Sequence, residues 1–413
     1  MRVRTPWVEA LRKHREKGSD PTKTSSTPAT PLDRHLTPKK MSESFHRVVI
    51  PLAQDPWLLD NYLNAKGHIR LGTIFMDLDA LSGVIAYKHT GESVTTVTAA
   101  VDRITINHPL KELCDLELSV AKAPEKGVEV NKEDVLMTCA FTMVSLDPST
   151  KKPVAICPIK CETEEEKRLF ALGQKHSTEK KALAKKTLRK QAPNDEESDL
   201  IHAMWLKQLQ YHDPNISTRK PENVIYMAET SQQSSQIMQP QYRNRHNFMI
   251  FGGFLLKQTF ELAFCCAAAF SHSRPTFVSL DPSTFENPVP VGSVLYLTAT
   301  VAYTDLPLVT TTSAGDGVDE TAEGHAEKYT RVQIRIDSKV RNIEHGETKP
   351  TGQFNYTFLV ERDIRVMPST YSEFMIWIDA RRRAESVRAS IEGLEAGRGG
   401  ERKDDGKSVR ATE

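Results

Sequence analysis

The chain has no surplus of either charge and none of the cysteine spacings that hold metals. Its 413 residues include 55 Lys and Arg against 54 Asp and Glu, a formal net charge of +1. It therefore lacks the overall basic character typical of a nucleic-acid-binding protein. Its six cysteines form no Cys-x-x-Cys pair and no Cys/His cluster with zinc spacing. We expect reduced thiols, no metal and no nucleic-acid partner.

Several enzyme and membrane signatures are absent as well. The sequence contains no Gly-x-Ser-x-Gly motif, which argues against a serine hydrolase of the α/β class. It contains no P-loop and no Gly-rich dinucleotide motif. The longest apolar run, 253–270, carries Lys257, Gln258 and Glu261, which lipid would penalise heavily. We therefore predict no integral membrane segment and a helix enclosed within a folded protein.

That apolar run is the dominant feature of the sequence. It extends from Ile250 to Phe270, and Gly252 and Gly253 stand at its beginning. A helix that is apolar on nearly every face is normally buried. The first N–H groups of a helix have no intrahelical acceptor and lie at the positive end of its dipole. This end can therefore stabilise an oxygen that gains negative charge during a reaction.

A similar segment lies about 180 residues upstream. Residues 67–91 form another mostly apolar run that contains glycines, and strand-like sequence follows each of the two runs. Gly72 corresponds to Gly253, and Pro109 corresponds to Pro288. Two landmarks at nearly one offset indicate an internal duplication, and the period is far too long for a solenoid repeat. We therefore predict two copies of one domain.

The order of helix, Asn-Pro or His-Pro turn and long strands resembles a hotdog domain. The tandem pair, with Asp77-Leu-Asp79 in the first copy and Phe251-Gly-Gly in the second, resembles the mitochondrial acyl-coenzyme A thioesterases of the thioesterase 9 type, over roughly residues 45 to 380. The resemblance implies an α+β fold of two tandem hotdog domains, each an antiparallel sheet wrapped around a central helix. It also implies hydrolysis of fatty acyl-CoA, no cofactor beyond the coenzyme A of the substrate, a homo-oligomer and the mitochondrial matrix.

Composition and the resemblance together divide the chain into five parts. These are a basic and then Ser/Thr/Pro-rich segment 1–42, a first hotdog domain 43–161, a charged helical connector 162–216, a second hotdog domain 217–380, and a charged Gly-rich tail 381–413. We expect disorder at both ends. Acidic residues in the first segment weaken its reading as a mitochondrial presequence, so a cytoplasmic location stays open.

Thioester hydrolysis requires a polarised carbonyl and a deprotonated water molecule. In a hotdog pair, the N-terminus of one central helix faces a side chain of the other. Asp79, seven residues after Gly72, matches the general-base position of the related enzymes, and Gly253 stands at the facing N-terminus. Asp77 points about 200° away around the helix, so the two acids cannot share a site. The alternative for Asp79 is an ordinary capping or paired carboxylate.

The related enzymes place an asparagine shortly before the glycine pair. Here that position is Met249, so the nearest amide is Asn247, with Asn244 as a second candidate. An ordinary helix cap or turn is the competing role for Asn247. For binding the substrate we select four residues, and basic side chains among them suit coenzyme A phosphates. They are Gly252, Arg243, Arg245 and Arg274.

The position in the second copy that corresponds to Asp79 carries a different residue. Seven residues after Gly253 stands Phe260, and Glu261 follows it. We expect one competent site and one degraded or accessory site, for which Glu261 is the candidate acid unless it is a paired structural residue. Two other functions stay open, namely a non-catalytic acyl-CoA sensor or scaffold and an enoyl-CoA hydratase. Such hydratases pair an Asp with a nearby His, whereas the first His after Asp79 is His89.

Overall fold

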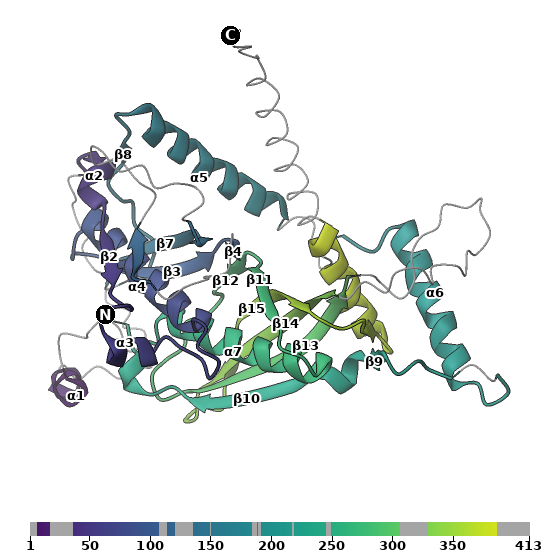
Figure 1. Ribbon diagram of the computed structural model, residues 1–413. Helices are drawn as coiled ribbons and strands as arrows, with labels where there is room; N and C mark the ends of the chain where they lie inside the picture. The colour runs from purple at the N-terminus through teal and green to yellow at the C-terminus, as the bar shows by residue number, and fades with distance from the viewer. Residues whose placement is uncertain are drawn as a thin grey trace, which may run out of the picture.

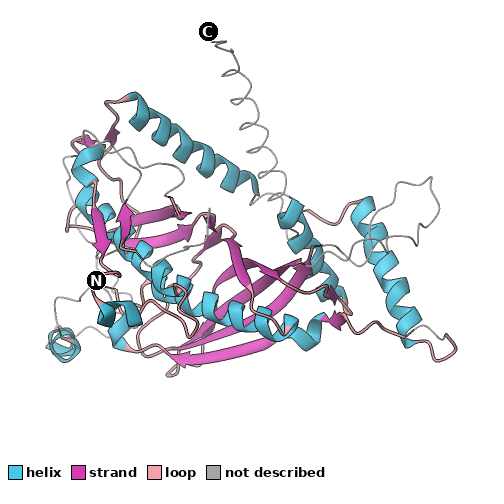
Figure 2. Cartoon of the chain, in the orientation of Figure 1, coloured by secondary structure: helices cyan, strands magenta, loops and turns pink. Residues whose placement is uncertain are grey.

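The computed structural model describes most of the chain. The described residues are 6–16, 36–106, 114–119, 135–148, 150–183, 188, 191–216, 219–244, 249–305 and 329–385. Within them lie two units of helix and antiparallel sheet, with the longer sheet in the second unit (Figures 1 and 2). This is the α+β architecture of two tandem hotdog domains that the sequence predicts.

The second unit consists of a 20-residue helix, α7 (Gly252–Ser271), against a long antiparallel sheet. Its strands, in spatial order, are β10 (Gln232–Ile237), β13 (Val294–Thr304), β14 (Thr330–Arg341), β15 (Thr348–Val360) and β11 (Thr276–Leu280). Neighbouring strands are antiparallel throughout. In Figure 1 the helix crosses one face of this sheet.

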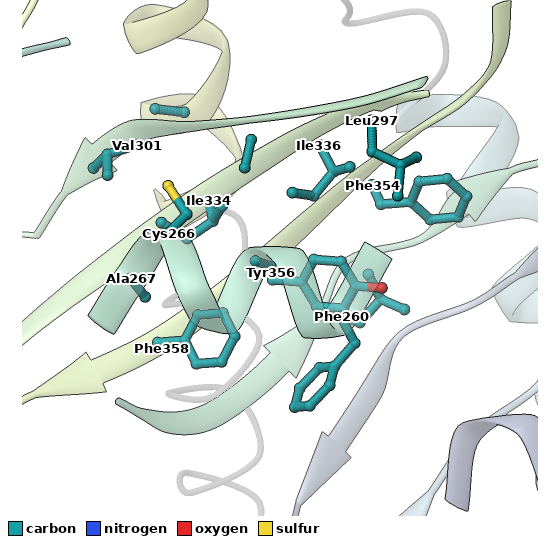
Figure 3. Close-up of a cluster of buried hydrophobic side chains, with 14 of the residues drawn as sticks. Phe260, Cys266, Ala267, Leu297, Val301, Ile334, Ile336, Phe354, Tyr356 and Phe358 are labelled. Carbon is teal, nitrogen blue, oxygen red and sulfur yellow. The ribbon is translucent and has the colours of Figure 1, made fainter. Parts of the chain in front are cut away.

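The core of the second unit lies between α7 and the sheet. Residues from the helix and from three strands fill it, and Figure 3 shows them: Phe260, Cys266, Ala267, Leu297, Val301, Ile334, Ile336, Phe354, Tyr356 and Phe358. The sheet side chains alternate along each strand because successive residues point to opposite faces. Inside this core the Tyr356 hydroxyl lies 2.8 Å from Oγ1 of Thr259 on α7, so its polar atom is satisfied. The apolar run is therefore a central core helix.

The first unit is built around α4 (Leu71–Thr90) and has shorter strands. These are β2 (Arg47–Ile50), β3 (Thr95–Val101), β4 (Ile104–Ile106), β5 (Leu116–Ser119), β6 (Met137–Thr138) and β7 (Phe141–Leu146). β3 pairs with β7, β2 with β5, and β4 with β6, all antiparallel. Two short helices precede α4 in the chain, α2 (Met41–Ser44) and α3 (Pro56–Asp60). Two 3₁₀ turns precede α7, η2 (Met227–Thr230) and η3 (Pro240–Tyr242).

The two units share a sheet edge. β11 pairs with β4, and β12 (Ser283–Thr284) pairs with β3, so the sheets join edge to edge. The central helices pack antiparallel at this joint. A Cβ on Gly72 would lie 3.3 Å from the side chain of Lys257, and one on Gly253 would lie 3.0 Å from Cα of Met76. The N-terminus of each helix thus reaches the middle of the other.

The connector contains two helices, α5 (Glu164–Leu183) and α6 (Asp195–His212). Helix α6 begins with a capping box, in which Asn194 and Glu197 bond each other's backbone N–H groups. Glu197 also receives two hydrogen bonds of 2.6 Å from Arg382, and this pair ties α6 to the helix formed by residues 371–385. In Figure 1, α6 lies beside the end of the long sheet, far from α4.

Several elements differ from the sequence prediction. Residues 154–159 are strand-like in sequence, but only β8 (Ile159–Lys160) forms there, and it pairs with β1 (Lys39–Lys40). The sequence suggests a last strand that begins at Tyr356, because the Pro and Gly shortly before it resemble a turn. In the structure, β15 begins eight residues earlier. The parallel pair β9 (Val224–Tyr226) and β16 (Arg365–Met367) closes the second unit. Part of the N-terminal segment forms α1 (Trp7–Glu16).

Helix α7 is long and apolar. Within the described residues it is the one helix whose length and composition would allow it to cross a bilayer. Of its most apolar 18-residue window, 56% is buried inside the protein. Its apolar character is thus accounted for by the core that it forms with the sheet.

Candidate active site

Asp79 stands where the two central helices meet. Its carboxylate is buried and accepts a hydrogen bond from the backbone N–H of Gly253, with an N to Oδ2 distance of 2.6 Å. Its other oxygen, Oδ1, accepts a hydrogen bond of 2.6 Å from the hydroxyl of Thr98 on β3. The structure thus brings together Asp79 and Gly253, the pair expected from the family resemblance, from 174 residues apart.

The glycine pair makes this close approach feasible. A Cβ on Gly253 would lie 2.7 Å from the ring of Phe251 and 2.9 Å from Cβ of Asp79, distances that real Cβ atoms essentially never show. The N-cap residue, Phe251, provides no side-chain cap. The Gly253 N–H is bonded to Asp79, while the Gly252 N–H, in the first turn, has no intrahelical acceptor. The Gly252 N–H is therefore available to a carbonyl oxygen of a ligand.

The environment of Asp79 sets its basicity. Burial raises the pKa of this carboxyl to about 6, and the hydrogen bonds from Thr98 and Gly253 act in the opposite direction. At neutral pH the group is therefore mostly ionised, yet it is a stronger base than an exposed aspartate. A general base is most effective when its pKa lies near the working pH.

Thr98 is the residue of this site that sequence reasoning missed. It lies in a Thr-rich strand, 95–101, where several threonines alternate and nothing in the sequence distinguishes one of them. The β-bulge between Thr98 and Ala100 interrupts the regular register. Such bulges often redirect a side chain next to an active site. The position of Thr98 follows from packing between β3 and α4.

Asp77 occupies a different environment on the same helix. It accepts a 2.6 Å hydrogen bond from the hydroxyl of Tyr62, and burial raises its pKa. The two acids therefore face different neighbours, as the helical angle between them requires.

The reciprocal position is apolar. A Cβ on Gly72 would lie 3.4 Å from the ring of Phe260, which therefore stands where the duplication would place a second acid. The ring of Phe277 packs edge-on against Phe260, with centroids 5.4 Å apart. The two strands at the joint each carry a bulge, after Thr98 in β3 and after Phe277 in β11, so these two residues correspond. A pair of phenylalanines thus replaces the Asp–Thr pair.

Glu261, the candidate acid for a second site, forms an ion pair with Arg70. Its Oε1 lies 2.9 Å from Nη2 of Arg70, and both side chains are partly exposed. Glu261 is therefore a paired residue, the alternative to a second catalytic acid that the sequence left open. His89 lies about three turns beyond Asp79 on α4, and its two ring nitrogens are bonded to Ser44 and to the carbonyl oxygen of Cys157. It is not in contact with Asp79, contrary to the pairing of a hydratase.

The remaining candidates are distributed unevenly. Arg243 forms a backbone bridge with Ile250, directly before the glycine pair, and its guanidinium lies 5.2 Å from the centroid of the Trp7 ring. Arg274 follows the other end of α7, roughly 30 Å along the helix axis, and is not brought to Asp79. Asn247 and Arg245 lie outside the described residues. The backbone N–H of Asn244 donates to the Met249 carbonyl, at 2.7 Å.

No group of three or more His, Cys, Asp or Glu side chains that could hold a metal ion occurs among the described residues. Two hotdog units with antiparallel central helices, and a buried carboxylate set against a glycine-opened helix N-terminus, define a tandem hotdog protein of the thioester-hydrolase class.

No family model matches the sequence. Among curated proteins, it is 32% identical over 379 residues to acyl-coenzyme A thioesterase 9, mitochondrial, of Bos taurus, covering 86% of this chain and 80% of that protein. It is 31% identical over 377 residues to the Mus musculus protein of the same name, with the same coverage. The chain belongs to this acyl-coenzyme A thioesterase 9 family.

A solved acyl-CoA hydrolase from Staphylococcus aureus, in complex with butyryl coenzyme A, coenzyme A and coenzyme A disulfide, is also similar. It is 20% identical, with a TM-score of 0.33, and the match covers 42% of this chain and 96% of that one. This likeness is too weak to add to the sequence relationship.

Proposed function

We propose that this acyl-CoA thioester hydrolase cleaves its substrate by direct attack of water, with Asp79 as general base and the N-terminus of α7 as the oxyanion site. The observation that carries the proposal is the buried contact between the Asp79 carboxylate and the Gly253 N–H. It sets a base of raised pKa beside the N-terminus of α7, where Gly252 stands in the first turn. Base and carbonyl-polarising group are the two parts that thioester hydrolysis needs.

The steps follow from this geometry. Asp79 takes a proton from a water molecule as the oxygen of that water attacks the thioester carbonyl carbon. The carbonyl oxygen gains negative charge, which the Gly252 N–H and the helix dipole stabilise. The tetrahedral intermediate then expels coenzyme A as the thiolate, which takes the proton from Asp79. The products are a free fatty acid and coenzyme A, and no covalent enzyme intermediate forms.

Each chain has one such site in this proposal. The second position of the duplicated pair offers Phe260 and Phe277 in place of a base and its hydroxyl partner. A phenyl ring cannot accept the proton from water. The Glu261 carboxylate is engaged with Arg70 and lies outside this aromatic cluster.

The surroundings of the substrate are also part of the proposal. Arg243, on the hairpin that leads into the glycine pair, is positioned to bind a phosphate of coenzyme A, and Arg245 follows it in sequence. We infer a mitochondrial enzyme, active in the matrix, because the curated relatives are named as mitochondrial. A homo-oligomer is inferred from the family alone.

The test is release of free thiol from a panel of acyl-CoAs, from short to long chains. Wild type, Asp79→Asn and Asp77→Asn should be compared, because the last is a matched acid on the same helix that does not contact the glycines. We expect turnover by wild type, a loss of at least about a hundredfold in kcat for Asp79→Asn, and a smaller effect for Asp77→Asn. Binding of acyl-CoA without thiol release by wild type would instead indicate a sensor.

A further inference from the structure

The ring of Phe285 lies beside the glycine that we assign to the oxyanion site. A Cβ placed on Gly252 would lie 3.4 Å from Cζ of Phe285, 3.2 Å from Cβ of Thr98 and 3.5 Å from Oδ2 of Asp79. Three side chains therefore crowd around Gly252, the residue whose N–H is proposed to bind the carbonyl oxygen. Phe285 is the apolar member of the three. Its side chain is half-buried, whereas Asp79 is buried, so the ring stands at the boundary of the site.

Phe285 is held rigidly by both units of the fold. Its N–H donates to the carbonyl of Ala99, in the β3 bulge beside Thr98, at 2.9 Å. On its other side it forms a bridge with Gly352 of β15. A Cβ on Gly352 would lie 2.8 Å from the Thr284 carbonyl oxygen, so the glycine is what allows β15 to come this close. The ring therefore cannot withdraw by a simple backbone shift.

The ring also marks the apolar side of the site. It packs edge-on against Phe354, with centroids 5.6 Å apart, and Phe354 is almost completely buried in the core. Arg243, in contrast, lies on the hairpin whose Ile250 N–H is bonded to the Val289 carbonyl. A phosphate suits Arg243, and a hydrocarbon chain suits the two phenylalanines. The first carbons of the acyl group then pass the Phe285 ring.

We propose that Phe285 is a specificity-determining residue, whose ring excludes acyl groups that carry a branch on the carbon next to the thioester carbonyl. This inference rests on the proposed function of the Asp79 site. A methyl branch at that carbon would project into the space that Phe285, Thr98 and Asp79 enclose, and a rigidly held ring leaves it no room. One methyl group in an apolar pocket changes kcat/KM by about 10- to 200-fold.

The duplication supplies a matched control. Phe285 stands three residues before Pro288, and Ile106 stands three residues before Pro109. Ile106 is the corresponding residue at the position that Phe260 and Phe277 fill, and it is likewise partly buried against the core. Truncation of Ile106 removes a comparable apolar side chain at the sheet joint without touching Asp79 or Gly252.

The test compares kcat/KM for hexanoyl-CoA and 2-methylhexanoyl-CoA, measured by thiol release. We expect the preference of wild type for the straight chain to fall about tenfold or more in Phe285→Ala, to fall by an intermediate factor in Phe285→Leu, and to be unchanged in Ile106→Ala. Thermal denaturation shows whether each variant is folded. If the alanine variant does not fold, the leucine variant decides by the same ratio.

Two results would overturn the inference. One is a straight-to-branched ratio within about twofold of wild type in the folded Phe285 variants, with thiol release intact, which would leave the proposed function standing. The other is absence of thiol release from both substrates by wild type, which would remove the proposed function and this inference with it.

Discussion

Replacing Thr98 by valine should shift the pH dependence of the enzyme toward higher pH. The hydroxyl of Thr98 donates a 2.6 Å hydrogen bond to Asp79, and this bond favours the ionised carboxylate. A hydrogen bond to a charged group is worth about 1.5–3 kcal/mol, and one pKa unit corresponds to about 1.4 kcal/mol. Valine keeps the shape of the side chain but donates nothing. The pKa of Asp79, about 6 in wild type, should therefore rise by about one to two units.

The higher pKa of Asp79 in Thr98→Val should lower activity at neutral pH. A general base must be ionised, so activity is lost as the pH falls through its pKa. At pH 7 about 90% of wild-type Asp79 is ionised, against about 10–50% in the variant, and kcat/KM should fall about two- to tenfold. At pH 9 most of this loss should disappear.

The assay is kcat/KM for one acyl-CoA from pH 5 to 9. Thr96→Val is the matched control, because Thr96 lies on the same strand and its hydroxyl contacts Ser145 at 3.3 Å rather than Asp79. An acid limb in Thr98→Val with the same midpoint as wild type would refute the claim that this hydroxyl tunes the base.

Three further predictions concern the helix joint. Gly253→Ala should destabilise the protein by about 1–3 kcal/mol and lower thiol release at least tenfold, because the new Cβ would lie 2.9 Å from Cβ of Asp79. Gly173→Ala is the control: a Cβ there meets open space, so this variant should keep both stability and activity. Asp79→Asn should raise the free energy of unfolding, measured in urea, by about 3 kcal/mol at pH 8 and by less at pH 4.5. Folding raises the pKa of Asp79 from 3.8 to about 6, so wild-type stability falls as the pH rises from about 4 to 6, and asparagine removes this loss. Glu261→Gln should change kcat less than about twofold, because its ion pair with Arg70 is partly exposed; a tenfold loss would indicate a working second site.

The central helices were predictable because their signals are local. Long apolar runs with glycines near their beginning predict both helices, and the resemblance to the thioesterase family selects Asp79. The prediction of Gly253 as its partner needed the family geometry, since no short-range pattern tells which helix end faces which side chain. The structure then places the two in contact.

The residues that the sequence did not reveal depend on long-range packing. Thr98 is one of several threonines in its strand, and only the β3 bulge against α4 makes it the partner of Asp79. The first half of β15 was missed because Gly352 is read as a strand breaker, whereas here it permits close packing against Thr284. Phe277 looks like any apolar strand residue until the edge-to-edge joint sets it opposite Phe260.

The most direct test of the account is a single turnover in water labelled with ¹⁸O, with enzyme in excess over acyl-CoA. Direct attack of water activated by Asp79 predicts one labelled oxygen in the fatty acid and none in the peptide that contains Asp79. If Asp79 instead attacked the thioester as a nucleophile and its anhydride were opened at the aspartyl carbonyl, the label would appear in that peptide and the fatty acid would be unlabelled. Label in the Asp79 peptide would contradict the general-base mechanism.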